Sequence, residues 1–201
     1  MKYFQGYICI NIDTPSIMDK KSDQEIIRQI TEENKDLFAE IVERYQKPLF
    51  RYIYRLGHFS KDECEDILQE TFIKVYKNLR AFDLEKKFSS WIYRITHNEV
   101  INYIKKRKKE VSLEKNNFDE VLPDNTDLFQ ELNIKQQFEK VKKEIYNLDV
   151  KYREVLILRY FQQKSYEEIS DILRKPINTV GTLISRAKNN LKENLSKYEK
   201  L

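Results

Sequence analysis

The stretch EDILQETFIKVY, residues 65–76, has two faces of different chemistry when it is wound as a helix. One face gathers Leu68, Thr71, Phe72, Val75 and Leu79. The other face gathers Asp66, Gln69, Glu70, Ile73, Lys77 and Arg80. Exposure of an isoleucine to water is unfavourable, and burial of carboxylates in a protein core is unfavourable too. A face that carries both fits neither solvent nor core, so we expect it to bind a partner. An ordinary solvated face is the alternative, since single exposed apolar residues are common.

The residues around this stretch repeat apolar side chains at helical spacing and predict one helical domain over residues 23–109. The first part of the pattern stops at Gly57, which we expect to act as a helix C-cap. Ser60 and Glu63 form a capping-box sequence, so the helix with the quoted stretch begins there. Another helix is predicted from about residue 89 to residue 109, after a short loop.

The rest of the chain divides by composition. Residues 1–22 lack helical periodicity; a short strand, a disordered tail or a translation start at Met18 all fit them. Residues 110–131 are acidic, contain Pro123 and hold only isolated apolar residues, which predicts an extended linker. Periodicity returns for residues 132–201 and predicts a second helical domain. The expected fold class is all-α, with two small helical domains joined by an acidic, extended linker.

The composition excludes several classes of protein. Three glycines and four prolines in 201 residues favour long helices over strands and tight turns. No apolar run reaches the roughly 18 residues of a membrane-spanning helix, and the N-terminus lacks the apolar stretch of a secretory signal. Cys9 and Cys64 are too few for a disulfide framework, so we expect a cytoplasmic protein without membrane insertion. His58 and His97 are isolated in sequence, so no metal site and no cofactor are expected.

The net charge of +4 hides three blocks of alternating sign. Residues 72–109 contain eleven Lys or Arg and three Asp or Glu. Residues 110–131 contain seven acids and one Lys, and residues 174–200 contain seven bases and two acids. Solvated surface is the simplest explanation for one such block. Two basic blocks joined by an acidic segment favour a polyphosphate partner such as nucleic acid.

The C-terminal residues 165–191 have the pattern of a helix-turn-helix. Ser165 and Glu168 form a second capping box, residues 174–176 (RKP) stop the helix, and Asn178 is expected to cap the next one. The apolar stripe of that second helix is Val180, Ile184, Ala187 and Leu191. Its opposite side carries Thr179, Thr182, Ser185, Arg186 and Asn189. Such polar side chains can bond to bases or phosphates in the major groove, and a plain helical hairpin is the alternative.

The segment after the quoted stretch mixes aromatic rings with cations. The rings are Phe82, Phe88, Trp91 and Tyr93, and the cations are Lys86, Lys87 and Arg94, with a basic run at residues 105–109. Aromatic rings stack on unpaired bases while cations neutralise phosphates, so we predict a surface for single-stranded nucleic acid. Packing in the core is the alternative, above all for Trp91 and Tyr93.

Two blocks of sequence, one in each predicted domain, resemble a known family. EDILQETFIKVYKNLRAF followed by FSSWIYRITHNEVINYIKK is similar to region 2 of the extracytoplasmic-function (ECF) sigma factors of bacterial RNA polymerase. YREVLILRYFQQKSYEEISDIL and NTVGTLISRAKNNL are similar to their region 4. The likeness covers about residues 25–200. It implies a sigma factor, which is no enzyme but a subunit that directs core polymerase to promoters and nucleates their melting.

The resemblance implies roles for particular residues. The motif that docks on the β′ clamp helices of core polymerase corresponds to Asp66, Gln69, Glu70 and Ile73. The surface that opens the minus-ten element and captures a flipped base corresponds to Lys86, Lys87, Phe88, Trp91, Asn98, Asn102 and Lys105. The reader of the minus-thirty-five element corresponds to Arg174, Lys175, Thr179, Thr182, Ser185, Arg186 and Asn189.

The resemblance also implies partners: core RNA polymerase through its β′ clamp helices and β flap, promoter DNA, and an anti-sigma protein. The acidic linker resembles the segment that the family threads through the RNA path of the polymerase, where its carboxylates occupy cationic surface. Three residues depart from the family pattern. Asn102 stands where many members have Asp, Lys105 where many have Arg, and Gly181 where Lys is usual. These departures bear on the promoter sequence.

Two other functions stay open from the residues alone. A stand-alone helix-turn-helix regulator would have no use for Asp66, Gln69 and Glu70, so binding to core polymerase separates it from a sigma factor. A nucleic-acid enzyme would hold a metal with Asp and Glu side chains. The acids of residues 62–70 lie at a helix start without a converging set of His or Cys, which disfavours that alternative.

Overall fold

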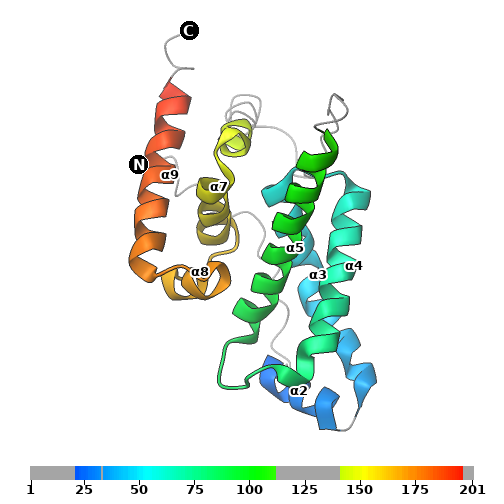
Figure 1. The fold of residues 1–201 in the computed structure, drawn as a ribbon. Coiled ribbons are helices and arrows are strands. Elements are labelled where there is room, and N and C mark those ends of the chain that lie inside the picture. Colours follow the sequence, from blue (N-terminus) through cyan, green and yellow to red (C-terminus); the bar gives the residue numbers. More distant parts are fainter. Residues whose placement is uncertain (1–20, 33, 112–140, 197–201) are drawn as a thin grey trace, which may run out of the picture.

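The computed structural model describes residues 21–32, 34–111 and 141–196 of the chain. Every regular element in these residues is helical, which confirms the all-α prediction (Figure 1). Most of the predicted N-terminal extension and of the acidic linker lies outside the described residues. Residues 110 and 111, which the sequence assigned to the linker, form the end of a helix instead.

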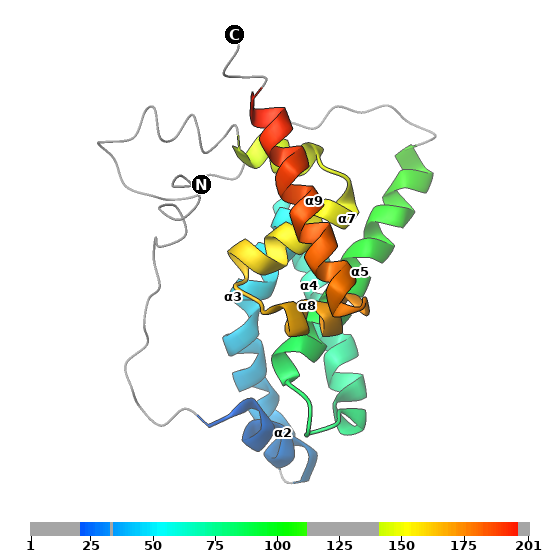
Figure 2. The same cartoon turned by 90° about the vertical axis from the view of Figure 1, so that its left-hand side faces the viewer.

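The first domain is a bundle of long helices. Its elements are α2 (Asp23–Glu32), η1 (Lys35–Leu37), α3 (Phe38–Gly57), α4 (Lys61–Asn78), η2 (Leu79–Ala81) and α5 (Phe88–Val111). Helices α3, α4 and α5 lie side by side, and α2 packs across their lower ends (Figures 1 and 2). The apolar pattern that precedes Gly57 forms α2 and α3, with the short η1 between them.

The start of α4 and the end of α3 test two local predictions. The Ser60–Glu63 capping box is present: Glu63 N–H donates to Ser60 Oγ (3.3 Å), and Ser60 N–H donates to Glu63 Oε2 (2.8 Å). The predicted C-cap is wrong by one residue, because His58 adopts the left-handed conformation, with φ of 53°. Gly57 is needed for space instead, since a Cβ there would lie 1.8 Å from the Phe59 ring.

The second domain contains the predicted helix-turn-helix. Residues 141–147 are helical, followed by α7 (Val150–Leu156), the π-helical segment η3 (Ile157–Phe161), α8 (Tyr166–Leu173) and α9 (Ile177–Ser196). The Ser165–Glu168 capping box forms as predicted. Asn178 does not cap α9, because the helix already begins at Ile177 and the Pro176 carbonyl accepts from the N–H groups of Thr179 and Val180.

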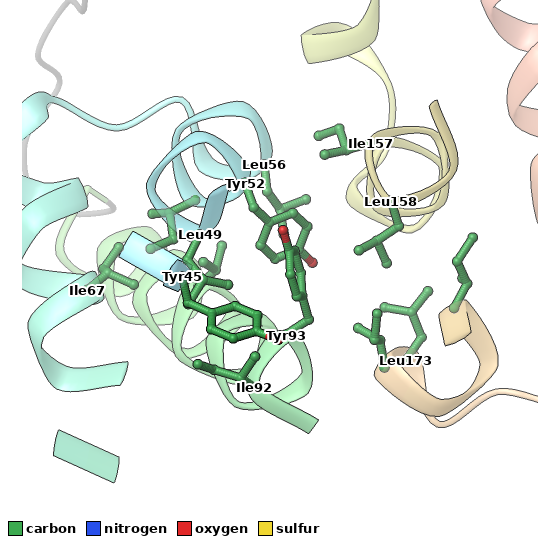
Figure 3. Packing of buried hydrophobic residues seen from close by; sticks show 14 of the residues in the cluster. Tyr45, Leu49, Tyr52, Leu56, Ile67, Ile92, Tyr93, Ile157, Leu158 and Leu173 are labelled. Carbon is green, nitrogen blue, oxygen red and sulfur yellow. The ribbon is translucent and has the colours of Figure 1, made fainter. Parts of the chain in front are cut away.

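The two domains pack against each other. Helix α8 lies along the first half of α5, and α7 and η3 lie against α3 (Figure 1). Figure 3 shows Tyr52 and Tyr93 of the first domain on the side that faces Leu158 and Leu173 of the second. Tyr93 Oη donates a hydrogen bond to Gln162 Oε1 across this contact (2.6 Å). The packing brings parts of both predicted DNA-binding surfaces close to the opposite domain.

Candidate protein-binding and DNA-binding surfaces

Helix α4 presents the face that the sequence predicted. Asp66, Gln69, Glu70 and Ile73 are all exposed, and we call these four residues the docking face. The inner side of α4 is buried through Cys64, Ile67, Thr71 and Val75. Ile73 keeps 45% of its surface exposed, so burial against a partner would remove apolar area from water.

An apolar hollow that sequence analysis missed lies beside Ile73. It has a volume of about 250 Å³ and is lined by Phe38, Phe72, Ile73, Tyr76 and Lys77. Tyr76 packs edge-on against Phe38 of α3, with ring centroids 5.0 Å apart. Tyr76 follows Ile73 by three residues and so carried a helical signal, whereas Phe38 belongs to another helix and carried none. The docking face therefore combines carboxylates at one end with an apolar recess at the other.

The aromatic residues near the start of α5 divide between core and surface. Phe88 is 1% exposed and packs edge-on against Tyr45 (5.5 Å) and Phe82 (5.4 Å). The base-capture role expected of Phe88 therefore does not fit this structure, and the alternative of core packing does. Tyr93 is buried as well. Trp91 is half-buried against the Phe82 ring, so part of its surface is accessible.

The polar residues predicted for the minus-ten surface are exposed. Asn98, Asn102 and Lys105 follow one another at helical spacing along one side of α5. Lys86 and Lys87 lie in and at the end of the loop that precedes α5, also exposed. The ammonium group of Lys87 lies 4.0 Å from the carboxylate of Glu168 in α8, so docking of the second domain reaches the edge of this surface.

A buried polar cluster joins the two domains. His97 Nδ1 lies 3.0 Å from Tyr52 Oη, and its Nε2 lies 3.7 Å from Glu154 Oε2. Burial, helped by the positive charge of Lys175, lowers the pKa of His97 to about 4, so the ring is neutral at neutral pH. Burial raises the pKa of Glu154, although its hydrogen bond with Lys175 opposes the shift.

Lys175 forms an ion pair inside the second domain that the amino-acid sequence did not predict. Its ammonium group donates to Glu154 Oε1 at 2.9 Å, and its side chain is 33% exposed. Ionised Glu154, buried to 5% exposure, needs such a partner, because an unpaired buried carboxylate is costly. Lys175 is thus partly committed to the packing of the second domain rather than fully available to DNA.

The outer side of α9 is exposed as predicted. Thr179, Thr182, Ser185, Arg186 and Asn189 are accessible, as is Arg174 in the turn, while the stripe Val180, Ile184, Ala187 and Leu191 is buried. Two exposed apolar residues beside this face, Tyr166 and Ile177, were not predicted. Their exposure depends on how α8 meets α9, which periodicity does not describe.

No cluster of three or more His, Cys, Asp or Glu with the geometry of a metal site occurs among the described residues. Within the same part of the chain, no helix has the length and apolar character needed to cross a membrane. A helical bundle with an acidic and apolar docking face, linked to a helix-turn-helix with a polar outer side, defines a DNA-binding factor that also binds a protein.

Comparison with known proteins agrees with this class. Sigma-70 region 2 matches residues 41–110, and Sigma-70 region 4 matches residues 139–191. The ECF RNA polymerase sigma factor SigW of Bacillus subtilis is 35% identical over 183 residues, covering 84% of this chain and 94% of SigW. The ECF RNA polymerase sigma-E factor of Haemophilus influenzae is 28% identical over 183 residues, covering 85% of this chain and 93% of the sigma-E chain.

A solved structure has a similar fold. The sigma factor RpoE of Bartonella quintana, in complex with the anti-sigma factor NepR, superposes with a TM-score of 0.65 at 26% identity, covering 79% of this chain and 96% of RpoE. The chain belongs to the family of ECF RNA polymerase sigma factors. It is a transcription initiation factor that directs RNA polymerase, and not an enzyme.

Proposed function

We propose that the docking face of α4 binds core RNA polymerase, at the β′ clamp helices. The observation that carries this proposal is the exposure of Asp66, Gln69, Glu70 and Ile73 on one side of a helix whose other side is buried. Carboxylates attract a basic partner and set its orientation, and Ile73 with the adjacent hollow provides the desolvated centre that strong interfaces share. The second domain contacts the β flap of the same enzyme.

Residues 23–109 also read and open the minus-ten element in this proposal. Trp91, Lys86, Lys87, Asn98, Asn102 and Lys105 provide the contacts. Phe88 lies beneath this surface and holds the Trp91 ring, their centroids being 5.6 Å apart. Trp91 has the accessible ring area on which an unpaired base can stack.

Residues 132–201 read the minus-thirty-five element. Arg174, Thr179, Thr182, Ser185, Arg186 and Asn189 are exposed on or beside α9 and can reach a major groove together. Lys175 joins them once its bond to Glu154 opens. The acidic segment of residues 110–131 passes through the RNA path of the polymerase. Promoter recognition by this chain needs no cofactor. We place the protein in the cytoplasm, where its polymerase and DNA are found.

An anti-sigma protein controls the chain in this proposal. The relative RpoE was solved in complex with the anti-sigma factor NepR. The close packing of the two domains seen in this chain offers a state that such a partner can hold, because it ties Lys87 to Glu168 and Tyr93 to Gln162.

Transcription in vitro with core polymerase and a promoter library tests the proposed function. The triple variant Asp66→Ala, Gln69→Ala, Glu70→Ala should lose pull-down of core polymerase and transcript formation, while its circular dichroism stays unchanged. The variant Glu40→Ala, Glu43→Ala, Gln46→Ala is the matched control, because it likewise removes two carboxylates and one amide from an exposed side of α3. Equal loss in both variants, or in neither, would remove the docking assignment.

A further inference from the structure

A second hollow lies on the helix-turn-helix, where the start of α8 meets the first two turns of α9. It has a volume of about 700 Å³ and opens to solvent. It is lined by Tyr166, Ile177, Asn178, Gly181, Thr182, Ser185 and Arg186. Thr182, Ser185 and Arg186 belong to the outer side of α9. Tyr166 and Ile177 are apolar and remain 38% and 41% exposed. Because both side chains line the same hollow, a group that enters it would bury apolar area of both.

The walls of this hollow are held in place. The edge of the Tyr166 ring lies over Gly181, because a Cβ added at that glycine would be 3.6 Å from Tyr166 Cε2. The guanidinium of Arg159 lies over the same ring, 5.4 Å from its centroid. Arg159 is itself fixed, since its Nη1 donates to the Lys164 carbonyl at 2.9 Å. The absence of a side chain at Gly181 leaves a notch between Tyr166 and Ile177.

The surroundings of the notch fit DNA better than a protein. Arg186, Ser185 and Asn178 border it with hydrogen-bonding groups. Between residues 174 and 196 the chain has five Lys or Arg and only one acid, Glu193. In the major groove, the C5-methyl group of thymine is the apolar feature that a side chain can recognise. A surface that is basic and polar, with one apolar notch, matches that pattern.

We propose that the notch between Tyr166 and Ile177 receives the C5-methyl group of a thymine in the minus-thirty-five element. This inference rests on the proposed function of α9 and adds to it one base preference. Cytosine at the same position would leave the notch empty and would present an amino group in place of the O4 acceptor of thymine. The notch thus adds recognition of the methyl group to what the hydrogen-bonding residues can read at this base.

Uracil interference tests the proposal with the full chain bound to core polymerase. Promoter duplexes selected by this holoenzyme are prepared with deoxyuridine randomly replacing thymidine, which removes only the methyl group. Bound and free fractions are then compared position by position. We expect one thymine of the minus-thirty-five element at which uracil lowers affinity about fourfold, the value of one buried methyl group.

Two variants connect this position to the notch. Ile177→Ser should abolish the thymine preference at that position and leave the other positions unchanged, whereas Ile177→Val should retain it. Both substitutions are at an exposed site, and equal melting temperatures check that the fold persists. Two results would overturn this inference and leave the proposed function intact. In the first, the holoenzyme binds the promoter but no position is sensitive to uracil. In the second, the sensitivity to uracil persists in Ile177→Ser.

Two further outcomes also separate the alternatives. A holoenzyme that binds no promoter specifically would overturn the proposed function together with the inference. If Ile177→Ser weakens the binding of core polymerase but not the selection of thymine, the notch belongs to a protein interface and the thymine assignment is wrong.

Discussion

Helices α4 and α9 are built on the same plan and differ in what they show to solvent. Each buries a stripe of small and apolar residues, centred on Ile67 in α4 and on Ile184 in α9. The outer side of α4 carries carboxylates and an apolar recess around Ile73, while the outer side of α9 carries hydroxyl, amide and guanidinium groups. The comparison teaches that the inner stripe establishes the fold, and that the outer side chains select the class of partner.

The largest expected effect separates the inner stripes from the outer sides. Ile67→Ala and Ile184→Ala should each lower the free energy of unfolding by about 2 to 5 kcal/mol, because each leaves a cavity in a packed core. Ile73→Ala removes the same atoms from an exposed position and should change that free energy by less than about 0.5 kcal/mol. Urea denaturation followed by circular dichroism measures all three. A similar loss for Ile73→Ala would mean that α4 has no distinct outer side.

The next effect separates the two outer sides by partner. Ile73→Asp should weaken binding of core polymerase by about 2 kcal/mol, roughly thirtyfold, because it places a charge at the desolvated centre of the interface. Arg186→Ala should weaken promoter binding by about 1 to 3 kcal/mol without affecting core polymerase. Fluorescence anisotropy with labelled core enzyme or labelled promoter gives both affinities.

Lys188→Ala is the matched control for Arg186→Ala. Lys188 is an exposed cation of α9 that neither lines the hollow nor belongs to the predicted DNA-reading residues. Promoter affinity should fall less than for Arg186→Ala. If each of Ile73→Asp and Arg186→Ala impaired both binding events equally, the division of partners between α4 and α9 would be wrong.

A smaller effect, of opposite sign in the two domains, concerns their glycines. Gly57→Ala should destabilise the first domain, because the new Cβ would lie 1.8 Å from the Phe59 ring and the ring must move. Gly181→Ala should stabilise the second domain by up to about 1 kcal/mol, because alanine favours helix and its Cβ meets Tyr166 at an ordinary distance of 3.6 Å. Thermal unfolding of both variants against the parent shows the two signs, and a loss of stability for Gly181→Ala would contradict the second.

The smallest effect is a pH dependence of the contact between the domains. The pKa of His97 is lowered to about 4 in the packed arrangement and would return toward 6.5 on separation. Protonation therefore favours separation, so the packing is fully stable above pH 6.5 and weakens as the pH falls toward 4. The raised pKa of Glu154 acts in the opposite direction and cancels part of this effect. Small-angle scattering at about pH 7.5 and about pH 5, on either side of the ordinary histidine pKa of 6.5 that His97 regains on separation, should show expansion at the lower pH.

His97→Gln isolates the contribution of the imidazole. The amide does not titrate, so the acid-side expansion should disappear and only the opposite trend from Glu154 should remain. An expansion that persists in His97→Gln would assign the pH response to other groups.

The position of Phe88 could not be predicted from the sequence alone. A phenylalanine next to lysines and a tryptophan predicts a ring for base stacking, and the same residues fit a core position equally well. The structure places its ring between Tyr45 and Phe82, which come from α3 and from the loop before α5. No periodicity within one segment specifies that neighbourhood. The hollow beside Ile73 was missed for the same reason, since Phe38 lies 35 residues away in another helix.

What the amino-acid sequence determined by itself is local: the capping boxes of α4 and α8, the inner stripe of α9, and the chemistry of the exposed sides. These follow from hydrogen bonds and spacings within a few residues, which repeat along a helix whatever it packs against. The inner stripe of α4 was predicted only in part, because Ile67 is buried in place of Leu68. Only the tertiary structure decided that Phe88 is buried, that Lys175 pairs with Glu154, and that Tyr166 and Ile177 enclose a notch. Each of these depends on which helices meet and at what register, because burial and pairing are properties of the neighbours that the fold brings together.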